Sequence, residues 1–223
     1  MTAADIADKS PAPQAARFKP VHPRLVRWWH WINAFAIFFM IGSGWRIYNA
    51  SPIFKFRFFN DLTIGGWLGG ALQIHFAAMW LFVINGLVYL IYGFASGHFR
   101  RSFLPLRPRD VLSDFNLALE GKLAHHVGTY NAVQRLAYLG VITAFVGIVV
   151  SGLAVWKPVQ FQTLAWALGG YEGARIVHFL AMSAIVAFIL LHVTLVAIVP
   201  STLWPMLWGR ARGEHKSDGR GVP

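Results

Sequence analysis

The stretch that decides the fold is RIVHFLAMSAIVAFILLHVTL, residues 175–195, an almost wholly apolar segment that holds two histidines. It has the length of about 20 apolar residues that a membrane-spanning helix needs. His178 and His192 are ionisable, and such groups are costly inside a membrane and usually functional there. Fourteen residues separate them. On a helix this spacing returns to nearly the same face, about 21 Å further along. We therefore expect two sites on one helix face, at two depths.

The composition of the whole chain agrees with a membrane protein. Of its 223 residues, 56% are hydrophobic and only 13% are charged, and the mean hydropathy is +0.50. The net charge of +11 lies in tails and loops beside apolar segments, so it indicates topology and lipid contact rather than nucleic-acid binding. The absence of cysteine excludes disulfides, Fe–S clusters and covalently attached c-type haem.

Apolar runs predict an all-α integral membrane protein with four spans. The chain is interpreted as a single domain, residues 1–223, with a core over 24–200 and mobile polar tails at 1–20 and 210–223. The predicted spans lie at about residues 25–48, 70–95, 132–156 and 173–199.

The basic residues set the predicted orientation. With four spans, both tails and the loop between the second and third spans share one side. That side carries 15 of the 20 lysines and arginines. Because positive charge stays on the cytoplasmic side, both termini are predicted to be cytoplasmic.

Four of the nine histidines fall within predicted spans. His30 and His192 lie near the cytoplasmic ends of the first and last spans, and His75 and His178 lie near the outer ends of the second and last. Depth therefore predicts an inner pair, His30 with His192, and an outer pair, His75 with His178. Bis-imidazole ligation of b-type haem is chemistry that fits two such pairs without cysteine. A proton relay or a structural polar network also remains open.

Two glycines fit a bulky group between these helices. Gly44 follows His30 by fourteen residues, on nearly the same face and at the outer depth. Gly86 follows His75 by eleven residues, toward the inner depth. Each helix would then offer a ligand at one depth and clearance at the other. Ordinary close packing of membrane helices also favours glycine and explains these two positions equally well.

Three arginines near the span ends are candidate partners for haem propionates. Arg46 and Arg175 lie on the outer side, and Arg135 lies on the inner side. Guanidinium groups bind carboxylates well, and propionates sit near the membrane surface. An interfacial anchor is the competing interpretation for each of them.

Four segments together resemble a known family. The order of these segments and the fourteen-residue histidine spacing resemble the b-type cytochrome subunits of Ni,Fe-hydrogenases, thiosulfate reductases and formate dehydrogenases, and bacterial dihaem cytochromes of the b561 type. The resemblance covers about residues 24–200. The segments are RLVRWWHWINAFAIFFMIGSG (24–44), IHFAAMW (74–80), YNAVQRLAY (130–138) and RIVHFLAMSAIVAFILLHV (175–193).

The resemblance implies a four-helix bundle in the bacterial inner membrane that holds two haems b on the histidine pairs named above. It implies electron transfer between a quinone and a periplasmic redox enzyme, either a molybdoenzyme or a hydrogenase. In some formate-dehydrogenase-type members the quinone site lies beside the inner haem. If that carries over, Asn131, Gln134 and Arg135 are candidates for its wall.

Two other functions compete with an electron-transfer subunit. A stand-alone dihaem oxidoreductase linked to quinone would act on a small molecule such as superoxide, steered by outer basic residues. A transporter would relay protons through its buried histidines. Co-purification with a periplasmic enzyme would distinguish an electron-transfer subunit from a stand-alone oxidoreductase. A visible haem spectrum would distinguish either of these from a transporter. Whether the chain is an enzyme in its own right stays open.

Overall fold

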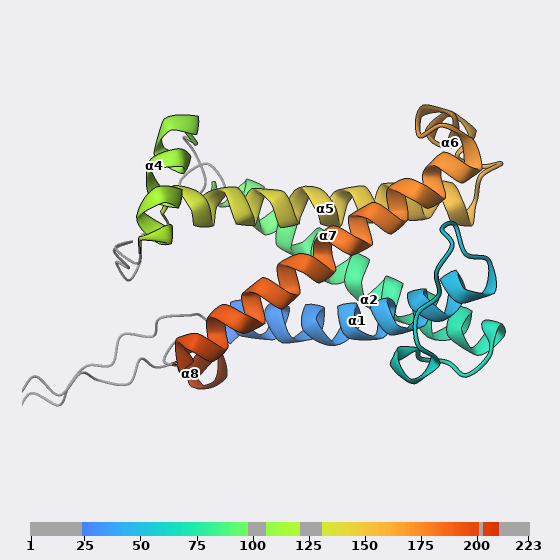
Figure 1. Ribbon diagram of the computed structural model, residues 1–223, viewed down its shortest axis with the longest axis horizontal. Helices are drawn as coiled ribbons and strands as arrows, with labels where there is room; N and C mark the ends of the chain where they lie inside the picture. Colours follow the sequence, from blue (N-terminus) through green and yellow to red (C-terminus); the bar gives the residue numbers. More distant parts are fainter. Residues whose placement is uncertain (1–23, 98–105, 121–130, 201–202, 210–223) are drawn as a thin grey trace, which may run out of the picture. The chain divides into compact units, whose positions relative to one another are not determined.

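Every regular element in the described part of the chain is helical. The computed structural model describes residues 24–97, 106–120, 131–200 and 203–209. For these residues the all-α prediction is confirmed, and both predicted tails lie outside them. The elements, shown in Figure 1, are α1 (Arg24–Ala50), η1 (Asn60–Leu62), α2 (Leu68–Ala95), α4 (Pro108–Leu119), α5 (Ala132–Trp156), α6 (Gln162–Ala167), α7 (Gly170–Ile198) and α8 (Leu203–Trp208).

The four longest helices, α1, α2, α5 and α7, coincide with the four predicted spans to within a few residues. Two of them, α2 and α7, begin slightly earlier than expected. Each follows a glycine turn in the left-handed region, with φ of +66° at Gly66 and +87° at Gly169. Glycine adopts this conformation without steric cost, so the chain can reverse abruptly and start the helix at once.

Among the described residues, three helices, α2, α5 and α7, are long and apolar enough to cross a membrane by length and composition. These are three of the four predicted spans. The fourth, α1, has 27 residues but is not in that group. Its ends carry Arg24, Arg27 and Arg46, and its first half holds tryptophans and a histidine, which lower its mean hydropathy.

A small apolar core lies within the compact unit formed by residues 29–195. One buried residue from each long helix contributes to it: Ala36 of α1, Phe82 of α2, Ile148 of α5 and Ile185 of α7. The opposite faces of these helices are apolar and exposed. An exposed apolar surface on every long helix suits lipid as the surrounding solvent.

One end of this unit holds a helix that sequence analysis did not predict. α4 begins at Pro108, and Asp110 lies in its first turn, both of which favour a helix start. The Asp114 carboxylate accepts a hydrogen bond from the Ala132 backbone N–H at 2.7 Å, at the start of α5. α4 thus lies against the beginning of α5, at the end of the unit opposite α6 (Figure 1).

The described residues 24–28, 196–200 and 203–209 belong to a second compact unit. Among its described residues, the Arg27 guanidinium Nη2 donates to the Leu207 carbonyl at 2.8 Å. This bond ties the first turn of α1 to α8. Trp208 of α8 is exposed, which suits an interfacial position because tryptophan favours that depth.

Candidate functional site

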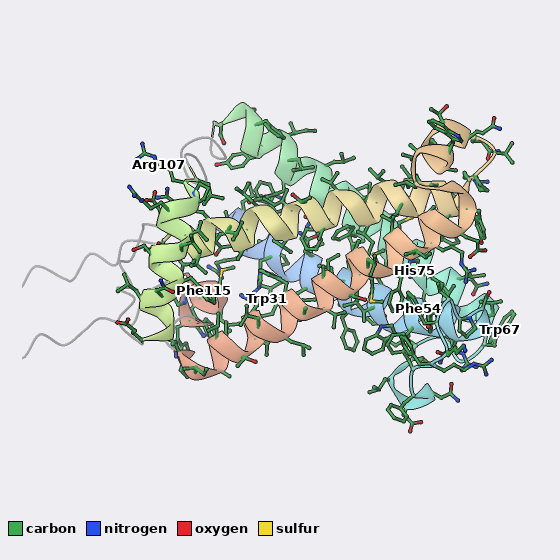
Figure 2. The ribbon with its side chains drawn as sticks, turned by 45° about the horizontal axis from the view of Figure 1, so that its top comes forward. Trp31, Phe54, Trp67, His75, Arg107 and Phe115 are labelled. Atoms are coloured by element: carbon green, nitrogen blue, oxygen red, sulfur yellow. The ribbon has the colours of Figure 1, made fainter. Side chains whose placement is uncertain are left out.

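The outer pair of histidines joins α2 to α7. The ring centroids of His75 and His178 are 6.5 Å apart, and the ring planes meet at 64°. Both residues are half-buried. Figure 2 labels His75, which lies where α2 runs beside α1 and α7. The structure therefore brings together the two histidines that depth assigned to the outer level.

The inner pair joins α1 to α7. The ring centroids of His30 and His192 are 6.2 Å apart, with the planes at 65°. Phe188 stacks on the His192 ring at 5.9 Å, with only 7° between the planes. Both pairs use α7, and the pairing in space is the one that the depth argument predicts. Ligation of a metal by these rings stays a prediction.

The ring separations suit one metal ion between each pair. Two metal–nitrogen bonds of about 2 Å, plus roughly 1 Å from each ring centre to its nitrogen, give about 6 Å. The observed separations are 6.2 and 6.5 Å. Within the described ranges, no group of three or more histidines, cysteines or carboxylates could hold a metal. Two protein ligands per ion fit haem, whose macrocycle supplies the remaining ligands, better than zinc, which takes three or four from protein.

Glycines lie against both rings of the outer pair. A Cβ built on Gly44 would lie 3.5 Å from Cε1 of His75, and one on Gly152 would lie 3.1 Å from Cε1 of His178. Gly44 is thus at the outer level, as its spacing predicts. A Cβ on Gly86 would meet no heavy atom within 4 Å, so open space adjoins that position. Gly152 was not singled out from the sequence.

Two fully buried serines contact the same two rings, and sequence analysis missed both. The Ser43 hydroxyl lies 3.1 Å from Nδ1 of His75, and the Ser151 hydroxyl lies 3.1 Å from Nδ1 of His178. Each serine directly precedes a glycine that faces the same ring. The sequence signal that could have identified them is a Ser–Gly dipeptide in each of two predicted spans, at positions 43–44 and 151–152.

Two buried polar atoms have no hydrogen-bond partner among the described residues and lie close in sequence to the site. They are the indole Nε1 of Trp45, next to Gly44, and Oδ1 of Asn33, one turn after His30. An indole N–H can only donate, and a buried donor without an acceptor is costly. An anionic group from a bound cofactor would supply the acceptor that Trp45 lacks.

The comparison with known proteins now decides the family. Residues 21–209 match the family described as prokaryotic cytochrome b561. The chain belongs to the prokaryotic cytochrome b561 family. The resemblance found in the sequence is confirmed, and membership implies haem b and an electron-transfer role in a membrane.

Two relatives of this cytochrome b561 chain carry names of redox-enzyme subunits. A protein of Azospira oryzae named "Putative protein-methionine-sulfoxide reductase subunit YedZ1" is 52% identical over 190 residues, which is 85% of this chain and 96% of the relative. A protein of Bradyrhizobium diazoefficiens named "Probable Ni/Fe-hydrogenase B-type cytochrome subunit" is 25% identical over 191 residues, 78% of this chain and 75% of the relative.

The predicted propionate partners on the outer side of this cytochrome already bond to protein groups. Arg46 Nη1 donates to Oδ1 of Asn60 at 2.8 Å. Arg175 Nη1 donates to Glu172 at 2.9 Å, and its Nη2 donates to the Ser51 carbonyl at 2.5 Å. Arg175 therefore links α7 to the segment after α1. A guanidinium has five N–H donors, so these bonds leave capacity for a carboxylate.

The two polar residues predicted to line a quinone site form the N-terminal cap of α5. The Asn131 side chain accepts from the Gln134 backbone N–H at 2.8 Å, and the Gln134 side chain accepts from the Asn131 backbone N–H at 3.2 Å. This is a reciprocal capping box, which satisfies two N–H groups at a helix start. Arg135 follows in the first turn of α5, where its backbone N–H donates to the Asn131 carbonyl at 3.0 Å.

Proposed function

We propose that this chain is a dihaem cytochrome b that carries electrons between the quinone pool and a periplasmic redox enzyme. The observation that carries the proposal is the presence of two histidine pairs with ring centroids 6.2 and 6.5 Å apart. His30 and His192 would ligate the inner haem, and His75 and His178 the outer haem. Haem b, when bound, supplies a one-electron carrier at each site.

The proposal includes a four-helix bundle in the bacterial inner membrane with both termini cytoplasmic. α1 would be the fourth span, although its mean hydropathy is low. Its uncharged stretch between Arg27 and Arg46 supports this, because 18 helical residues extend for about 27 Å, close to the hydrocarbon thickness. The excess of lysine and arginine on one side supports the orientation.

The residues between the two sites would keep water out of the path of the electron. His178 and His192 lie on one helix, about 21 Å apart along its axis. Ile185 lies halfway between them and is 4% exposed. Ala181, Met182 and Ile189 of α7 pack against the same apolar cluster. A dry, apolar gap of this kind suits electron transfer and opposes the passage of protons.

A protein-methionine-sulfoxide reductase is the partner that the proposal favours. The relative at 52% identity is named as a subunit of such an enzyme, whereas the hydrogenase-type relative is 25% identical. The segment between α1 and α2 offers a docking surface, since Phe59 and Trp67 are 80% and 69% exposed beside the cationic Arg57. Exposed aromatic groups of this kind commonly mark binding surfaces.

The quinone site is proposed on the inner side, from the family resemblance. Asn131, Gln134 and Arg135 stay candidates for its wall. The capping box gives Asn131 and Gln134 a structural role as well, so substitution of either residue needs a separate measure of helix stability.

A visible spectrum of purified protein made with ample haem tests the cofactor. We expect a reduced b-type band and two haems per chain. His178→Ala and His192→Ala should each remove one haem, the outer and the inner respectively. Colourless protein would overturn the proposal in favour of a proton relay.

Co-purification tests the partner. We expect a periplasmic reductase in stoichiometric amount when the neighbouring genes are expressed together. A lone chain with full activity toward a small molecule such as superoxide would overturn the subunit role and leave the haem assignment intact.

A further inference from the structure

The outer histidines contact matching hydroxyl groups on two different helices. Ser43 of α1 reaches Nδ1 of His75 on α2, and Ser151 of α5 reaches Nδ1 of His178 on α7, each at 3.1 Å. Both serines have no exposed surface. Each ring also has a backbone hydrogen-bond partner one turn before its serine, Met40 for His75 and Ile148 for His178. Serine oxygen and backbone carbonyl are therefore the two acceptors available to each ring N–H.

The direction of these hydrogen bonds follows from the other contacts of the hydroxyls. The Ser43 oxygen lies 2.6 Å from the Phe39 carbonyl oxygen, and the Ser151 oxygen lies 2.7 Å from the Gly147 carbonyl oxygen. A carbonyl only accepts, so the single hydroxyl hydrogen is given to the carbonyl. The lone pairs of each serine oxygen then face Nδ1, which must carry a hydrogen. The reverse arrangement would leave two oxygen lone pairs facing each other at 2.6–2.7 Å.

A neutral imidazole with hydrogen on Nδ1 has its lone pair on Nε2, the nitrogen that is then able to bind a metal. We propose that Ser43 and Ser151 are positioning residues that, together with the Met40 and Ile148 carbonyls, hold His75 and His178 in this tautomer and strengthen both rings as ligands of the outer haem. This inference rests on the proposed dihaem function and deepens it. Donation from Nδ1–H makes an imidazole more basic, which favours the oxidised metal.

The predicted effect is a lower potential at the outer haem than the same two ligands would give without the serines. Partners of this kind are worth about 10- to 100-fold in metal affinity. If one hydroxyl favours the oxidised over the reduced metal tenfold, its loss raises the midpoint potential by about 59 mV. Because the two serines contact the two different histidines that would hold this haem, their effects should add.

The test is a redox titration of the full-length protein, followed in the visible band, for Ser43→Ala, Ser151→Ala and the double variant. Ser183→Ala is the matched control, because the Ser183 hydroxyl also donates to a carbonyl four residues earlier, at 2.9 Å. His178→Ala identifies which component of the titration is the outer haem. Ser→Thr at 43 and 151 keeps the hydroxyl and should restore the original potential.

We expect the outer component to rise by about 59 mV per serine while the inner component stays unchanged. Full haem content with unchanged potentials in the double variant would overturn the inference. So would loss of the outer haem from the alanine variants that threonine does not restore, because packing would then explain it. If the parent protein holds no haem, the proposed function fails instead, which separates the two failures.

Discussion

Replacing Gly152 by alanine places one methyl group against a histidine of the outer pair, whereas the same change at Gly44 does not crowd its partner. The new Cβ would lie 3.1 Å from Cε1 of His178 in the first case and 3.5 Å from Cε1 of His75 in the second. Favourable carbon–carbon contact begins at about 3.5 Å. His178 must therefore move by about 0.4 Å, and His75 can stay where it is.

The cost of this movement sets the size of the effect. Ligand distances at a metal site tolerate about 0.2 Å, and overpacking costs about 1–3 kcal/mol. That range corresponds to roughly 5- to 150-fold weaker haem binding at the outer site. Both substitutions gain about 1 kcal/mol of helix propensity. Because both variants gain equally in helix propensity, the difference in outer-haem content between Gly152→Ala and Gly44→Ala measures the effect of the contact with the histidine ring.

The assay is haem content per chain, measured from the reduced spectrum after purification and detergent washing. We expect Gly152→Ala to lose more of the outer haem than Gly44→Ala does, with the inner haem intact in both. Equal haem content in the two variants, or a greater loss from Gly44→Ala, would refute the reasoning. Gly147→Ala, also on α5 and with no heavy atom within 4 Å, is the control.

Three further changes test other parts of the molecule. Gly86→Ala should lower the content of the inner haem, because the spacing of Gly86 from His75 places it toward the inner pair. The melting temperature should not fall, since the new Cβ meets no protein atom within 4 Å. Unchanged haem content would show that the cofactor does not occupy the open space beside Gly86. Asn131→Ala should cost about 1 kcal/mol of stability by loss of the α5 cap, and a raised KM for quinone at an unchanged melting temperature would argue for a quinone contact instead. Asn85→Ala removes the 3.1 Å hydrogen bond from Asn85 Nδ2 to the carbonyl of Trp29, the residue before His30. We expect the spectrum of the inner haem to shift and that of the outer haem to stay unaltered. A shift of the outer haem alone would contradict the pairing of His30 with His192.

Sequence alone sufficed for features that depend on length and depth. A membrane helix is specified by its apolar run, so the bounds of α5 were predicted as observed. The histidine pairs were predicted from the constant rise per residue of a helix and from the alternating direction of successive spans. α1 was harder, since its tryptophans and arginines lower the hydropathy of a helix of full spanning length.

Features that depend on which helix faces touch could not be predicted in the same way. Ser43 and Ser151 look like ordinary membrane-helix serines, because their bonds to the preceding turn exist with or without a histidine nearby. Their role depends on the rotation of α1 and α5 about their axes, and this rotation cannot be predicted from a single sequence. The capping box was different. The pattern NAVQ at residues 131–134 has the polar spacing of a helix start, so the cap could have been predicted from the sequence, whereas the quinone wall stays a prediction.

The continuity of α7 has a consequence for how the protein responds to its lipid surroundings. No glycine or proline interrupts the helix between His178 and His192. The distance between these two histidines along the helix axis is therefore constant. A thinner or thicker bilayer can change the tilt of α7 but cannot change the distance between the two histidines. In the proposed dihaem protein, the distance for electron transfer between the two sites, and with it the rate, should then be insensitive to lipid composition, even where the depth of each site in the membrane changes.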